Sequence, residues 1–242
     1  LLIEICPDDF LDPVSIFSGI VPKGSLSVFI IPIDKEAPKG RIILPQVQAL
    51  RDLLDQDSYC LVVKENEYKK ALSELNKKPD LVVCDSQVVD KMVSETPEGV
   101  KCTTFSILFA RYKADLLEAV KGASVIDRLQ DNDRVLIVEA CSHHAIEDDI
   151  GRVKIPKWLK TYTGKKLKIE VVSGRDYPEN LKNYKLVIHC GGCMFTRRQM
   201  LARVQKARED GAAITNYGVA IAKLKGILDR VLSPFEEVLI TA

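Results

Sequence analysis

The sequence predicts an α/β protein of two domains, each built on a mostly parallel sheet flanked by helices. Short apolar runs rich in β-branched residues alternate along the 242-residue chain with segments whose apolar residues recur at helical spacing. Turns that contain Pro or Gly separate the two kinds of segment. Because parallel strands are joined by crossover connections that usually contain a helix, this alternation indicates parallel sheets with helices on their faces.

The first half of the chain begins this pattern. Residues 26–33 (LSVFIIPI) form an apolar run typical of a buried strand. A helix is expected from Pro45, where the missing N–H costs little, and Val47, Leu50 and Leu54 recur on a face that we expect to lie in the core rather than on a dimer surface. The other elements predicted here are strands at 59–63 and 81–84 and helices at 67–75 and 88–92.

A polar segment with a proline and a glycine, residues 95–99, marks the predicted domain boundary. We therefore place one domain at residues 1–97 and a second at residues 98–242. Gly211 is expected to end a helix in the left-handed conformation. The elements predicted in the second domain are helices at 106–120, 157–162, 196–209 and 219–232 and strands at 134–138, 167–172, 185–188 and 212–214.

Composition excludes several classes of protein. Lys and Arg number 35 against 34 Asp and Glu, so the chain lacks the basic excess of a nucleic-acid-binding protein. No apolar run is long enough to span a bilayer, and the start at Leu1 resembles no signal peptide. Because the chain lacks an initiator methionine, we expect it to be a fragment. The seven cysteines are an odd and sparse set, four of them far from any other, which argues against a disulfide framework and favours a reducing, cytoplasmic compartment.

All three histidines lie beside cysteines, in the clusters Cys-Ser-His-His at 141–144 and His-Cys-Gly-Gly-Cys at 189–193. The first cluster follows the predicted strand 134–138 and the second follows the predicted strand 185–188. Ligands collect outside the carboxyl ends of parallel strands, most often where the strand order reverses. We therefore expect the two clusters to meet at one edge of the sheet, whereas Cys60 and Cys84 are expected to be small core residues.

Three thiolates with imidazoles suit zinc or an iron–sulfur cluster. Gly191 and Gly192 permit a tight turn and leave room for a bulky group. Cys193 is expected at the start of the following helix, whose positive end would stabilise a thiolate, helped by Arg197 or Arg198. Only three thiolates would leave one iron position of a 4Fe-4S cluster open.

Two other interpretations of these cysteines remain open. Cys190 and Cys193 could form a redox dithiol, with Cys190 as nucleophile, although this would explain neither Cys141 nor the histidines. Three cysteines and one histidine could also form a closed structural zinc site that stabilises an interaction module. His144 is expected to be a bystander or a supporting group, because His143 occupies the spaced position.

The pattern Cys141-x-His143, then His189-Cys190-x-x-Cys193, resembles the cluster-binding signature of the FeFe-hydrogenase maturation factor family, HydF. Segments elsewhere in the chain resemble the same family, so the likeness covers nearly the whole sequence. They are residues 37–41 (APKGR), 44–48 (LPQVQ), 104–113 (TFSILFARYK), 148–156 (DDIGRVKIP) and 216–222 (NYGVAIA).

The resemblance implies a scaffold rather than an enzyme. Proteins of this family have an N-terminal GTPase, a middle dimerisation domain and a C-terminal cluster-binding domain, and this chain resembles the last two. It has no G-x-x-x-x-G-K-[ST] motif, so we expect it to bind no GTP of its own. By resemblance, residues 1–97 would form a homodimer and residues 98–242 would bind the cluster.

The resemblance also implies cofactors, partners and roles for the site residues. The family carries a 4Fe-4S cluster, transiently holds a diiron precursor of the hydrogenase active site, delivers it to apo FeFe-hydrogenase and works with two radical-SAM maturases. By position, Cys141, Cys190 and Cys193 would be the cluster thiolates. His143 and His189 would supply a variable fourth ligand or would tune the open iron through hydrogen bonds.

Overall fold

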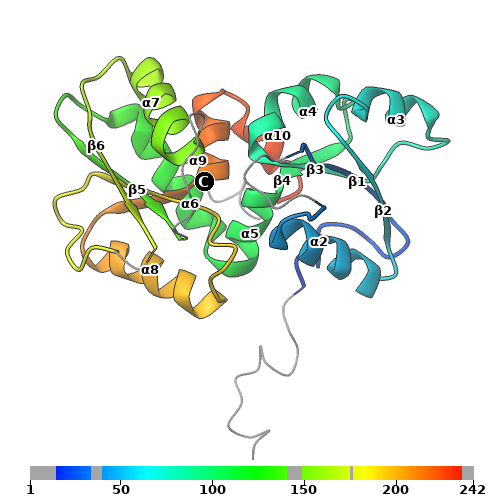
Figure 1. The fold of residues 1–242 in the computed structure, drawn as a ribbon, viewed down its shortest axis with the longest axis horizontal. Coiled ribbons are helices and arrows are strands. Elements are labelled where there is room, and N and C mark those ends of the chain that lie inside the picture. Colours follow the sequence, from blue (N-terminus) through cyan, green and yellow to red (C-terminus); the bar gives the residue numbers. More distant parts are fainter. Residues whose placement is uncertain (1–14, 34–39, 141–148, 175–176, 236–242) are drawn as a thin grey trace, which may run out of the picture.

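The computed structural model describes residues 15–33, 40–140, 149–174 and 177–235 (Figure 1). Within them the chain forms two four-stranded sheets in which every pairing is parallel. The predicted α/β class, with two mostly parallel sheets flanked by helices, is therefore confirmed.

The two sheets share one topology. The first has the order β2-β1-β3-β4 and the second the order β6-β5-β7-β8, so each has its switch point between its first and third strands. The strands of the first sheet are β1 (Leu26–Ile30), β2 (Tyr59–Val63), β3 (Leu81–Cys84) and β4 (Lys101–Thr104). Those of the second are β5 (Arg134–Glu139), β6 (Lys168–Ser173), β7 (Leu186–His189) and β8 (Ala213–Asn216).

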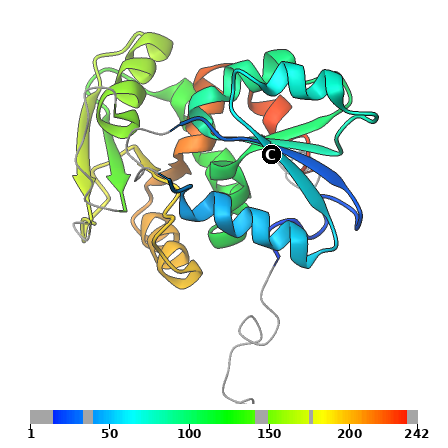
Figure 2. The same cartoon turned by 45° about the vertical axis from the view of Figure 1, so that its right-hand side comes forward.

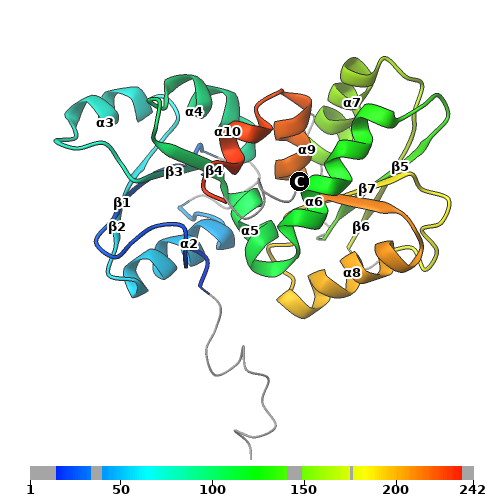
Figure 3. The same ribbon diagram turned by 180° about the vertical axis from the view of Figure 1, so that it is seen from behind.

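Helices lie between the sheets and on their outer faces. They are α2 (Leu44–Asp55), α3 (Tyr68–Glu74), α4 (Val89–Glu95), α5 (Phe105–Lys113), α6 (Leu116–Ser124), α7 (Ile155–Thr163), α8 (Arg197–Glu209), α9 (Tyr217–Leu224) and α10 (Leu228–Leu232). Figures 1 and 3 show α5, α9 and α10 between the two sheets. In the turned view of Figure 2, α2 of the first half and α8 of the second lie on the same side of the molecule.

One apolar core joins the two halves. It contains residues of the first sheet, such as Phe29, together with Leu108 of α5 and Ile221 of α9. Phe105, at the start of α5, packs edge-on against Phe29 with ring centroids 5.1 Å apart. Since burial of an aromatic side chain is strongly stabilising, α5 is fixed between the sheets. A smaller cluster that includes Val187 packs beneath α8.

The seven predicted strands are present with shifts of at most three residues at their ends, but β4 was missed. Because β4 pairs with β3, the first sheet extends past the boundary expected after residue 97. The expected core face of α2 is only partly right: Leu50 packs against the core, whereas Val47 and Leu54 are exposed. Cys84 is buried as expected, and Cys60 is half-buried.

Two segments that were each expected to form one long helix form two shorter helices instead. The helix expected at 106–120 ends at Lys113 and starts again at Leu116, because the Asp115 side chain accepts a hydrogen bond from Glu118 N and caps α6. The helix expected at 219–232 is interrupted at Gly226, which has φ +69°. Gly211 has φ +72° after α8, as predicted. None of the helices in the described ranges is both long and apolar enough to cross a membrane.

A glycine permits the close packing of α6 on the second sheet. A Cβ at Gly122 would overlap the carbonyl oxygen of Ile214 on β8. We therefore expect Gly122→Ala to destabilise the protein by about 2–3 kcal/mol through overpacking, measured as the free energy of unfolding in urea. Lys121→Ala, at an exposed position of the same helix, should change stability by less than about 0.5 kcal/mol. A stabilised Gly122→Ala protein, as helix propensity alone predicts, would contradict this packing.

Candidate metal centre

The second cysteine cluster lies at the switch point of the second sheet. β5 and β7 are neighbours there, and Cys190 N donates a 2.8 Å hydrogen bond to Val138 O. Ala140 N, directly after β5, donates to Cys190 Sγ at 3.0 Å. The Cys190 sulfur therefore contacts the residue that precedes Cys141 in the sequence. Cys141, His143 and His144 themselves lie outside the described residues.

The C-x-x-C loop is compact and precedes its helix. Gly192 has φ +57°, a conformation that favours glycine, and a Cβ there would also displace the Met200 side chain. Phe195 N donates to Gly192 O at 2.9 Å and closes a turn. Helix α8 begins only at Arg197, with Thr196 as its capping residue. The expected location of Cys193 at the start of the helix is therefore wrong, since Thr196 caps the helix end instead.

Both described cysteines of the motif line one cavity of about 240 Å³. Its walls come from both halves of the chain: Pro45 and Phe105 from the first half, Tyr217 from the second, and the loop of Cys190 to Cys193. Most of the lining is apolar, which favours a soft, thiolate-bound group over a strongly hydrated ion. These residues fit an iron–sulfur cluster, although the described residues alone contain no group of three or more metal-binding side chains.

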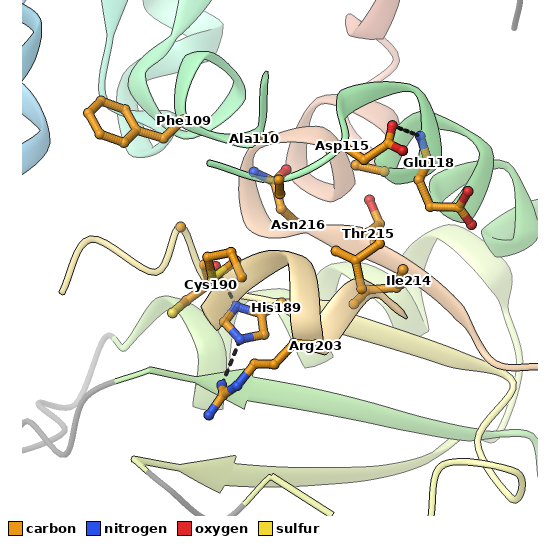
Figure 4. A pocket seen from close by; sticks show the side chains of 15 residues that line it. Phe109, Ala110, Asp115, Glu118, His189, Cys190, Arg203, Ile214, Thr215 and Asn216 are labelled. Atoms are coloured by element: carbon orange, nitrogen blue, oxygen red, sulfur yellow. Dashed lines mark hydrogen bonds between the residues drawn. The ribbon is translucent and has the colours of Figure 1, made fainter. Parts of the chain in front are cut away.

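His189, the last residue of β7, is 1% exposed and both its ring nitrogens are engaged (Figure 4). Arg203 Nη1 lies 2.7 Å from His189 Nε2, and because a guanidinium can only donate, Nε2 is the acceptor. The proton is then on Nδ1, which donates to Cys190 O at 2.6 Å. Burial lowers the pKa of His189 to about 4, so the ring is neutral. Of the two roles that the resemblance left open, this geometry suits hydrogen-bonded support rather than ligation.

Arg203 of α8 connects several parts of the site. Its guanidinium carbon packs over two aromatic rings, 4.6 Å from the centroid of Tyr177 and 4.4 Å from that of Phe195. Nη2 donates to Gly174 O at 3.2 Å. Cation–π contacts with the two rings and the two hydrogen bonds together fix the side chain, and with it the ring of His189.

Lys113, at the end of α5, contacts the same loop from the other side. It is 6% exposed, and Nζ donates to Cys193 O at 3.1 Å and to Phe195 O at 3.0 Å. Sequence reasoning did not identify Lys113 or Arg203 as site residues. Lys113 ends the segment TFSILFARYK, which carried part of the family resemblance, so only that motif could have indicated it.

Two buried polar side chains, Glu139 and Tyr217, lie near the cysteine motif. Glu139, the last residue of β5, accepts from Arg152 Nη2 at 3.0 Å through Oε2, whereas its Oε1 has no hydrogen-bond partner among the described residues. The Tyr217 hydroxyl is likewise buried without such a partner. Burial, followed by the nearby Cys190 thiol and the Glu139 carboxylate, raises the pKa of Tyr217 well above its usual value. Tyr217 therefore remains a neutral hydrogen-bond donor next to the thiol.

The buried His189 predicts a pH dependence for the stability of the metal-free chain. Its folded pKa of about 4 lies below the ordinary value of 6.5, so the unfolded chain binds the proton first as the pH falls. Stability should therefore decrease between pH 6.5 and pH 4, by up to about 3 kcal/mol from this group. Urea unfolding of the wild type and of His189→Gln across this range isolates the contribution. The same decrease in both proteins would contradict a neutral, buried His189.

Comparison with known proteins identifies the family. Residues 16–114 match the hydrogen maturase F dimerization domain and residues 117–234 match the hydrogen maturase F tetramerization domain. No GTPase domain is among the matches, and no curated protein matches the chain. Among solved structures, that of an NtrC family transcriptional regulator from Clostridium acetobutylicum is 12% identical over 88% of this chain and 98% of that one, but its TM-score of 0.26 carries no argument. The two matched domains cover most of the sequence and confirm the resemblance, and the chain belongs to the hydrogen maturase F (HydF) family.

Proposed function

We propose that this chain binds a 4Fe-4S cluster through Cys141, Cys190 and Cys193, and that it holds a diiron precursor and delivers it to apo FeFe-hydrogenase. Membership of the HydF family implies a role in hydrogenase maturation. The observation that carries the cluster proposal is the hydrogen bond from Ala140 N to Cys190 Sγ. It directs one thiol of the C-x-x-C motif toward the chain segment that supplies the third.

Each side chain would have a distinct task. The three thiolates would hold three irons, and the cluster when bound would offer one iron without a cysteine ligand. His189 and Arg203 would keep the Cys190 backbone in place through the hydrogen bond to Cys190 O. His143 remains a candidate fourth ligand, since it follows Cys141 by two residues.

The structure bears on the two alternatives as well. A structural zinc site completed by His189 would require its nitrogen to leave Arg203 or Cys190 O, at the cost of a buried hydrogen bond. The hydrogen bond from Ala140 N to Cys190 Sγ would favour the thiolate of a redox dithiol as well as that of a cluster ligand, so it does not separate these two interpretations. Both alternatives are decided by the metal content of the protein.

Self-association is indicated by the matched dimerization and tetramerization domains. We propose that the first half forms a homodimer through the surface of α2 and the edge strand β2. Val47 and Leu54 on α2, with Tyr59 and Val62 on β2, are large exposed side chains that such an interface would cover. Two radical-SAM maturases and apo FeFe-hydrogenase are the proposed partners in a reducing cytoplasm, and the chain itself is proposed to be a carrier rather than an enzyme.

Metal and sulfide analysis of the anaerobically reconstituted chain tests the cluster. We expect about four irons and four sulfides per chain and an EPR signal in the reduced state. Each of Cys141→Ala, Cys190→Ala and Cys193→Ala should lose most of the iron, whereas Cys60→Ala should retain it. One zinc without sulfide would indicate the structural site. Full iron binding by Cys141→Ala would exclude the proposed ligand set.

A further inference from the structure

The buried Lys113 comes from a different part of the chain than the loop that it contacts. It is the last residue of α5 and lies in the segment that matches the dimerization domain. Its two acceptors, Cys193 O and Phe195 O, lie in the segment that matches the tetramerization domain. The first half of the protein therefore contributes a charged group to the cysteine loop of the second.

The two hydrogen bonds fix the backbone around Cys193. The carbonyls of Cys193 and Phe195 converge on one ammonium group at 3.1 and 3.0 Å. The hydrogen bond from Phe195 N to Gly192 O closes the turn that contains Cys193. Hydrogen bonds from a charged donor are stronger than those between neutral groups. The ammonium therefore restricts the backbone conformation of Cys193 and with it the position of the Cys193 side chain.

The charge of Lys113 is directed at the same cysteine. The Cys193 side chain lies within electrostatic range of the Lys113 ammonium, and the centroid of the Phe109 ring lies 5.3 Å from Nζ. Burying the lysine ammonium costs desolvation free energy, and this cost is offset when an anionic group binds next to it.

We propose that Lys113 is a positioning residue of the metal centre, which orients Cys193 through the two carbonyls and places a positive charge beside the anionic cluster. This inference rests on the cluster binding proposed above. A nearby cation stabilises the reduced cluster more than the oxidised one, because reduction adds a negative charge. Lys113 thus raises the reduction potential of the cluster and slows the loss of iron.

A charge-matched pair of variants tests the role. In Lys113→Gln a polar side chain without charge remains, and in Lys113→Arg the charge is kept. EPR-monitored redox titration of the reconstituted chain should give a lower midpoint potential for Lys113→Gln and a potential close to wild type for Lys113→Arg. Iron release to a chelator should be several-fold faster in Lys113→Gln. Lys121→Gln, an exposed change on α6, should match the wild type in both measurements.

The outcomes separate this inference from the proposed function. Wild-type protein that binds no iron–sulfur cluster would refute the function and the role of Lys113 with it. A wild-type cluster whose potential and iron release are unchanged in Lys113→Gln would refute the role of Lys113 alone. A circular-dichroism melting curve verifies that each variant is folded, and an equal shift in Lys113→Gln and Lys113→Arg would show that packing, not charge, is responsible and would overturn the proposal.

Discussion

The parallel pairing of β5 with β7 brings Ala140 and Cys190 together, and the rest of the candidate centre is arranged around that pair. Parallel strands end at the same edge of a sheet, so the strand pairing alone brings together residues that are distant in sequence. The edge is also the switch point of the second sheet, where the flanking connections diverge and leave space. A cavity of about 240 Å³ lies there, between the two halves of the molecule.

The two halves are joined as one structure rather than as separate units. Helix α5 packs in the common core through Phe105 and Leu108, and its far end carries Lys113 into the cysteine loop. Arg111 of the same helix donates to Ser18 O near the start of the described chain. One short helix therefore contacts the N-terminal segment, the core and the candidate metal centre. A change in the first half can reach the cysteines through these contacts.

Sequence periodicity predicted the α/β class because seven of the eight described strands are apolar enough to be recognised on their own. β4 was missed because its sequence, Lys-Cys-Thr-Thr, has no apolar run. It is buried because it pairs with β3 and packs against α10, and neither contact can be read from the local sequence. The break between α5 and α6 depends on the capping side chain of Asp115, a local signal that the continuous apolar spacing concealed.

The candidate centre was predictable only in part. The spacing of Cys190 and Cys193 after a strand indicated the site, because a strand end has a defined place in a parallel sheet. The engagement of His189 could not be inferred, since it depends on Arg203 of α8, which lies 14 residues further along the chain. Lys113 could not be inferred either, because its acceptors lie about 80 residues further along the chain.

Cluster binding by three cysteines is tested most directly by the Mössbauer spectrum of the chain reconstituted with ⁵⁷Fe. We predict a 4Fe-4S cluster in which one iron differs from the other three, because three thiolates bind only three of its four irons. Iron bound as single tetrahedral ions, or a spectrum with no bound iron in a correctly folded chain, would contradict it.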